Sequence, residues 1–237
     1  MRVLGADDAR RELAERGVVA DACLRGISFA DLRLFDVELS GCRLEDCDFD
    51  GFDGGRVSFG RCACVGLSMR HAHLDDAVFL CSTMPACRFD RSALGGARFE
   101  ECDLSNTSFS GAGLAGASFS DCKLLGSDFA KANAARMSLR RCNMQMSNLK
   151  FQNFRKARFE EVDFSEADLV GADFTGAVFD RCRFATANLS GALFANADLS
   201  TSDLAGFNLH ACKSIRNAAV SMCGAAQLLD SFGVRIV

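Results

Sequence analysis

The chain has 237 residues, a formal net charge of −4, 21 phenylalanines and a single proline, but no tryptophan or tyrosine. This length suits one domain with a sizeable core, and the acidic balance argues against direct binding of nucleic acid. There is no run of 18 apolar residues, so we expect no membrane span, and the amino terminus lacks the apolar region of a secretory signal. Thirteen cysteines predict reduced thiols in a cytoplasmic protein rather than a disulfide framework.

Residues 7–16 begin with two aspartates and are followed by Gly17, which predicts a short helix. Ala9, Leu13 and Val18 of this segment are expected to pack over the start of the chain that follows, which is strongly repetitive and would otherwise expose core and unpaired backbone at its end. We assign residues 1–20 to an N-terminal helical cap.

A large apolar residue then recurs every five positions from Leu24 to Leu209, without a slip of register. Leu, Phe or Met fills each of these positions except Gly54, Cys64 and Ala134. The residue two positions earlier is usually small. Strict internal repetition of this kind is the sequence signature of a solenoid.

A period of five fits neither an α-helix nor a continuous strand. Five residues advance a helix by about 500° and spread the apolar positions around it, and an odd period alternates the faces of a strand. The small and large residues of one unit point the same way from an extended segment, so the chain must turn once per unit. Four units close a square coil of 20 residues, with coils stacked about 4.8 Å apart. An all-β solenoid is therefore predicted over residues 21–213.

One coil is irregular in sequence. Gly54 replaces a core residue, Phe52 fills the small position beside it, and Cys64 follows two units later. A large-to-small exchange costs core packing, for which Phe52 can compensate. We expect a distorted side here, either as a tolerated irregularity or as a bulge that contacts a partner.

The fivefold pattern fades at Ser214. Residues 217–231 predict a helix with Met222, Ala225, Ala226 and Leu229 on one side, ended by Gly233 and an extended terminus. We assign residues 214–237 to a C-terminal helix and tail.

Units such as Ala167-Asp168-Leu169 resemble the A-(D/N)-(L/F)-x-x signature of pentapeptide-repeat proteins. This resemblance implies a right-handed quadrilateral β-helix with short helical caps; the periodicity alone gives the coil but not its hand. The tail from Gln227 to Val237 is similar to the ending of quinolone-resistance members, in which it mediates a tail-to-tail dimer. The tail is therefore either a homodimer interface or a simple cap. The residues for a dimer interface are Met222, Leu228, Leu229, Phe232, Val234 and Ile236.

No catalytic, cofactor or metal site is expected. Three scattered histidines do not make a triad, no phosphate-binding glycine loop is present, and a solid rod lacks a concave cavity for a substrate. Nine of the thirteen cysteines occupy the small inward position, and six of these lie in a column from Cys42 to Cys182 that also contains Ser82 and Val162. Stacked parallel side chains point the wrong way for disulfides, so we interpret the column as packing that requires small residues.

The outer surface is unevenly charged. Residues 36–53 hold seven acids, and residues 130–158 hold eight bases and no acid. Such runs are either solvated faces or docking surfaces for a partner of opposite charge. The candidate partner-binding residues are Asp36, Glu38, Glu45, Asp46, Asp48, Asp50, Asp53, Arg136, Arg140, Arg141 and Lys156.

The resemblance implies a non-enzymatic interaction protein. Quinolone-resistance pentapeptide proteins bind DNA gyrase and protect it from inhibitors, and an acidic rod can mimic duplex DNA, so one hypothesis is a type II topoisomerase as partner. The modest net charge and the basic stretch oppose it. The alternative is a scaffold or adaptor for another protein, for example in a secretion or assembly system. We expect no small-molecule substrate, no direct nucleic-acid binding and no membrane attachment.

Overall fold

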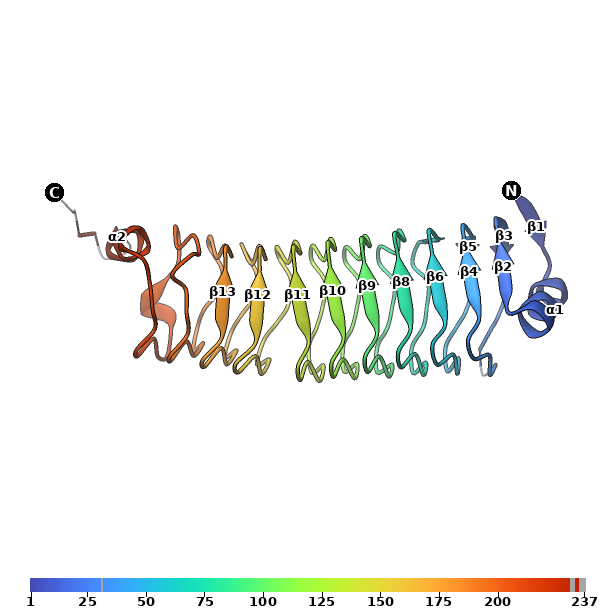
Figure 1. Cartoon of the computed structure of the whole chain (residues 1–237), viewed down its shortest axis with the longest axis horizontal. Helices are drawn as coiled ribbons and strands as arrows, with labels where there is room; N and C mark the ends of the chain where they lie inside the picture. The colour runs from blue at the N-terminus through green and yellow to red at the C-terminus, as the bar shows by residue number, and fades with distance from the viewer. Residues whose placement is uncertain (31, 231–232, 235–237) are drawn as a thin grey trace.

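The computed structural model describes residues 1–30, 32–230 and 233–234. They form a straight rod of stacked coils with one helix at each end (Figure 1). In chain order the elements are β1 (Arg2–Leu4), α1 (Ala6–Arg16), β2 (Val18–Ala20), β3 (Ala22–Arg25), β4 (Glu38–Ser40), β5 (Arg43–Glu45), β6 (Ser58–Gly60), β7 (Ala63–Cys64), β8 (Val78–Leu80), β9 (Arg98–Glu100), β10 (Ser118–Ser120), β11 (Ser138–Arg140), β12 (Arg158–Glu160), β13 (Val178–Asp180), the 3-10 helix η1 (Leu209–Ala211) and α2 (Met222–Asp230).

Each strand pairs in parallel with the equivalent strand of the next coil, as Phe99 of β9 does with Phe119 of β10. Nine strands form one long sheet in the order β13-β12-β11-β10-β9-β8-β6-β4-β2, and β1-β3-β5-β7 form a second. Isolated parallel bridges with the same spacing, such as Ser68 with Arg88, continue along the other two sides. The quadrilateral β-helix predicted from the period of five is confirmed.

Phenylalanines fill much of the axis in ordered columns. The rings of Phe99 and Phe119 stack with centroids 4.6 Å apart and planes 3° apart, whereas Phe109 meets Phe119 edge to face at 5.7 Å and 86°. Both geometries are favourable for aromatic pairs, at about 0.5–1.5 kcal/mol beyond area burial. Leu104 and Phe109 are fully buried, as the repeat predicts.

The N-terminal end is covered by α1. Gly17 ends the helix at φ 70°, a left-handed conformation that favours glycine, and its N–H donates to the Leu13 carbonyl. Ala9 and Leu13 are buried over the first coil. The expectation for Val18 is wrong: it points outward from β2, and its neighbour Val19 is buried instead, because side chains alternate along a strand.

The register changes once, near the C-terminal end. Leu193 bridges Ser214 and Asp198 bridges Ala219, each one position further along the chain than in the regular coils, after η1 in the same coil. The chain therefore remains in the coil through residue 219, and α2 begins later than the predicted helix start at residue 217. The buried residues of α2 are Gly224 and Leu228.

Gln227 of α2 bonds to the backbone on one side of the last coil. Its Oε1 accepts the N–H of Leu204 at 2.9 Å, and its Nε2 donates to Asp203 Oδ1 at 2.8 Å. The side-chain amide thus bonds where the next strand would otherwise pair. Met222 and Leu229, which the sequence places on one side of the helix, are 89% and 41% exposed.

The distortion expected at Gly54 is absent. A Cβ on Gly54 would lie 2.0 Å from Phe52 Cε1, so the phenyl ring occupies the space of the missing side chain. The backbone ladder is regular here, with Gly54 N–H donating to His73 O at 2.9 Å and Arg56 N–H to Asp75 O at 3.0 Å. The prediction of a distorted side is wrong because Phe52 fills the gap completely. Backbone hydrogen bonds between adjacent coils are missing instead near Ala134.

Candidate interaction surface

Buried, mostly apolar side chains fill the interior of the rod over the described residues. Among the described residues, no group of three or more His, Cys, Asp or Glu could hold a metal ion. In the same part of the chain, no helix is long and apolar enough to cross a membrane. His71 and His73 are exposed on the outer surface. Candidate functional residues must therefore be sought on the outside.

The cysteine column serves backbone hydrogen bonding as well as packing. The thiols of Cys62 and Cys122 donate to the carbonyls of Leu39 and Phe99 in the preceding coil, both at 3.3 Å. Ser82 has the same position in its coil. Its hydroxyl accepts the N–H of Cys62 and donates to the Phe59 carbonyl, both at 3.0 Å. Small size is therefore only part of what this position favours, and a short donor side chain is the rest.

The surroundings of several thiols, within and outside this column, oppose their ionisation. Burial raises the pKa of Cys87 and of Cys182, each to about 12. Cys81 is exposed, but a hydrogen bond to Glu101 raises its pKa as well. A reactive cysteine needs a lowered pKa, and all thirteen cysteines are free thiols in this structure.

The acidic stretch at residues 36–53 does not form a patch. It extends over almost one full coil, so a run in sequence becomes a ring around the rod. Arg56, one coil further on, donates to both carboxylate oxygens of Asp36 at 2.6 and 2.7 Å, which lowers the pKa of Asp36. The acids of this stretch that form ion pairs are Asp36, Glu45, Asp50 and Asp53. Those with no ion pair among the described residues are Glu38, Asp46 and Asp48.

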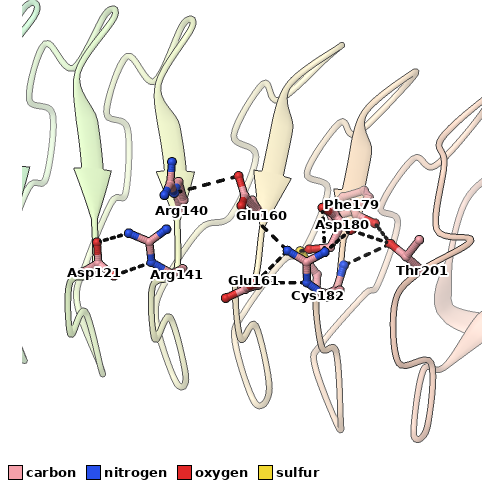
Figure 2. Close-up of polar contacts among 10 residues, drawn as sticks. Asp121, Arg140, Arg141, Glu160, Glu161, Phe179, Asp180, Cys182 and Thr201 are labelled. Carbon is pink, nitrogen blue, oxygen red and sulfur yellow. Dashed lines mark hydrogen bonds and ion pairs between the residues drawn. The ribbon is translucent and has the colours of Figure 1, made fainter.

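The basic stretch divides into paired and unpaired residues. Figure 2 shows the paired part at the ends of β10 to β13, where Arg141 contacts Asp121 at 2.5 Å and Arg140 approaches Glu160 at 4.0 Å. Arg136 and Lys156 lie on adjacent coils at one corner, and neither has an ion pair within the described chain. Two of the four predicted basic residues are therefore already neutralised by the protein itself.

The sequence interpretation missed four carboxylates that flank the nine-stranded sheet. We call the side of the rod formed by this sheet the sheet face. Asp75 and Asp76 lie on the corner before β8, and Glu100 and Glu101 lie on the corner at the end of β9; none forms an ion pair among the described residues. The two pairs are separated by one coil plus one side, so they occupy opposite rims of the sheet face on adjacent coils. That spacing is the signal that could have revealed them.

The two halves of the sheet face therefore differ in charge. The acidic half carries Asp75, Asp76, Glu100 and Glu101, all partly or fully exposed, and the exposed base Arg98 of β9 lies between its two rims. Further along, Arg158 projects from β12, next to the corner that carries Arg136 and Lys156. All three bases are exposed, and none forms an ion pair within the described chain. Between the halves, the sheet continues without an inserted loop.

The residues expected at a dimer interface have different surroundings. Leu228 is only 7% exposed, while Met222, Leu229 and Val234 are among the exposed large apolar side chains. Phe232 and Ile236 lie outside the described residues. An apolar surface therefore remains at this end without Leu228.

Comparison with known proteins agrees with this architecture. A model of the pentapeptide repeat region matches residues 55–129 and 114–194, more than half of the chain. Two structures of QnrB1, a plasmid-mediated fluoroquinolone resistance protein, are similar: a trypsin-treated variant has 21% identity and a TM-score of 0.67, covering 93% of this chain and 100% of its own. The full-length form has 20% identity and a TM-score of 0.66, covering 92% and 100%. No curated protein sequence matches. On this evidence the chain belongs to the pentapeptide repeat family.

Proposed function

We propose that this protein is a non-enzymatic binding protein that docks on a type II topoisomerase such as DNA gyrase, through the acidic half of the sheet face. One observation carries the proposal: unpaired carboxylates stand on both rims of a flat, uninterrupted sheet. Paired carboxylates elsewhere on the rod present little net field, because each one lies close to an arginine or lysine of its own or a neighbouring coil.

The local charge density supports a surface that resembles duplex DNA. Four carboxylates and Arg98 lie on two coils spaced about 4.8 Å apart, so they give roughly one net negative charge per 3.2 Å of rod. Duplex DNA carries about one per 1.7 Å. The densities are comparable over this short length, although the chain as a whole has a net charge of only −4. The resemblance to quinolone-resistance pentapeptide proteins, which implies gyrase as a partner, adds support, and a plasmid-mediated fluoroquinolone resistance protein has a similar fold.

The test is a gyrase supercoiling assay with and without a fluoroquinolone, titrating the purified protein. The wild type should inhibit supercoiling or relieve the drug. The variant Asp75→Asn/Asp76→Asn/Glu100→Gln/Glu101→Gln should lose this effect. A matched control, Asp46→Asn/Asp48→Asn/Asp163→Asn/Glu166→Gln, removes the same charge from unpaired acids on other sides of the rod and should keep it. Equal loss in both variants would assign the effect to net charge rather than to the sheet face.

A second candidate function is a scaffold or adaptor for a different protein. The observation that favours it is the basic half of the same face, because the positively charged DNA-binding surface of a topoisomerase would repel these bases. A flat response of gyrase to folded wild-type protein would reject the topoisomerase and favour this function. Capture experiments comparing wild type with an Arg136→Gln/Lys156→Gln variant would then test whether the partner is acidic.

The exposed apolar residues of α2 support a homodimer through the C-terminal end. Met222 and Leu229 leave α2 on its solvent side, and Val234 follows. Replacing Met222 and Leu229 with aspartate should give a monomer by light scattering while the coil remains folded, because Leu228 and Gln227 still cap the last coil. A wild-type monomer would reject the dimer and leave α2 as a cap alone.

A further inference from the structure

The backbone ladder is interrupted on the side of the rod that precedes the sheet face. On the other described coils of this side, the residues equivalent to Gly54 and Arg56 donate their N–H groups to the next coil. None of the corresponding bonds forms between residues 131–138 and 150–158, all of which are described. We call this boundary the seam. The N–H groups that lack their ladder partner are those of Lys131, Ala134, Arg136, Asn153 and Arg158.

The seam is local and lies next to a small core residue. It is closed at one end by Phe129 N–H donating to Asn148 O at 2.9 Å, and at the other by the pairing of Leu139 with Phe159. Ala134 holds the axial position that is leucine in the coils just before it and phenylalanine in the following ones. Ala132 and Ala157, which line the opening, are only partly buried, whereas equivalent small residues are fully buried. The coils therefore separate here without breaking the rod.

The opening holds an unusual set of donors. A cavity of about 360 Å³ lies along it, lined among others by Arg136, Ser138, Asn153, Lys156 and Arg158. Arg155 also lines it but is held by Asp173 at 3.0 Å. The three remaining bases have no carboxylate partner within the described chain, and residues 130–158 contain no acid.

We propose that the seam is a binding site for a phosphate group. Guanidinium groups bind phosphate through paired N–H donors, with charge-assisted hydrogen bonds. Free backbone N–H groups add fixed partial positive charge, as they do in other anion-binding concavities. The seam combines both kinds of donor from two adjacent coils. A tetrahedral dianion accepts from several directions at once, which suits donors on both lips better than a single planar carboxylate does.

The test is calorimetric titration of the purified full chain with pyrophosphate. The wild type should show saturable binding. The variant Arg136→Gln/Lys156→Gln/Arg158→Gln should bind at least about tenfold more weakly, since each charge-assisted hydrogen bond contributes enough for roughly that factor. The matched control Arg140→Gln/Arg141→Gln/Arg181→Gln removes three bases that are held in ion pairs, and it should bind like the wild type.

A second variant tests the seam without changing charge. Ala134→Leu restores the usual axial side chain, so it should close the seam and weaken pyrophosphate binding while the fold is retained. If this variant misfolds, the charge variants still decide the matter. No saturable binding by the wild type, or equal binding by the triple variant and the control, would overturn the proposal.

Competition then identifies the source of the phosphate. Displacement of pyrophosphate by a short DNA duplex indicates a nucleic-acid backbone, and retention of pyrophosphate indicates a small phosphorylated compound. Binding of an acidic peptide, with none of pyrophosphate, would replace phosphate by carboxylate and reject the proposal. The measurement uses the isolated protein, so its outcome is independent of gyrase.

Discussion

Gly54 and Ala134 are two positions of the same side where the repeat loses its large core residue, and their surroundings differ. At Gly54 the ring of Phe52 occupies the vacated space and the ladder remains regular. At Ala134 the corresponding small position holds Ala132, so nothing replaces the lost volume within the coil, and the seam opens. Regular backbone hydrogen bonding between coils therefore depends on the total side-chain volume that fills each side, not on the size of the residue at each single position.

A regular coil lies between Gly54 and Ala134, and disrupting its core should have the largest effect on the stability of the protein. Phe109→Asp removes a fully buried ring stacked between Phe89 and Phe129. Losing the ring costs about 3–5 kcal/mol, and the buried charge adds several more, which together approach the whole stability of a typical domain. Circular dichroism should show loss of cooperative unfolding. The outward Ser110→Asp is the control, and native-like melting of Phe109→Asp would mean that the column does not face inward.

Exchanging Phe52 and Gly54 should show directly whether the phenyl ring replaces the missing side chain. Phe52→Ala should cost about 3–5 kcal/mol, and Gly54→Leu alone about 1–3 kcal/mol, because its side chain collides with the ring. Together they restore the usual arrangement, so the double variant should be much more stable than the sum predicts. Urea unfolding of all four proteins measures this coupling. Strict additivity would show that the ring does not occupy the Gly54 side-chain space.

A smaller and more local difference should appear in amide hydrogen exchange. The N–H groups of Ala134 and Asn153 lack ladder partners, whereas those of Gly54 and His73 are bonded. The former pair should exchange at least about tenfold faster, since exchange follows local opening. Ala134→Leu should slow them toward the rate at Gly54. Equal protection in the wild-type protein would contradict an open seam.

The smallest effect on stability is expected from the buried thiols of the regular coils. The pKa of Cys87 and of Cys182 is raised in the folded state to about 12, above the ordinary value of about 8.5. The folded state therefore holds these protons more tightly, and this stability is fully present below about pH 8.5 and is lost as the pH rises toward 12. Unfolding free energies across this range should fall less steeply for Cys87→Ser/Cys182→Ser than for the wild type. Identical slopes would indicate that other groups cause the alkaline loss.

The fold was predictable because a period of five constrains every coil in the same way. The surface was less predictable, because neighbours in space are separated in sequence by a whole coil, or by a coil and one side. The run of acids from Asp36 to Asp53 is conspicuous in sequence but encircles the rod, while Asp75 and Glu101 are unremarkable in sequence and lie on opposite rims of the same face. Ion pairs such as Arg56 with Asp36 also join adjacent coils. The sequence indicates that Phe52 can compensate for Gly54, but how completely it does so depends on where the ring points, which composition does not specify.

Gln227 also gives the rod a defined length. An open parallel edge is a template for further strands and, repeated between copies, for a growing fibre. The amide of Gln227 bonds the N–H of Leu204 where another strand would pair, and the extra residue at η1 shifts the last coil out of the regular spacing. A second molecule approaching end to end therefore finds the Leu204 N–H already bonded and a last coil whose register differs from the regular spacing. Both features oppose the continued stacking of coils from one molecule onto the next.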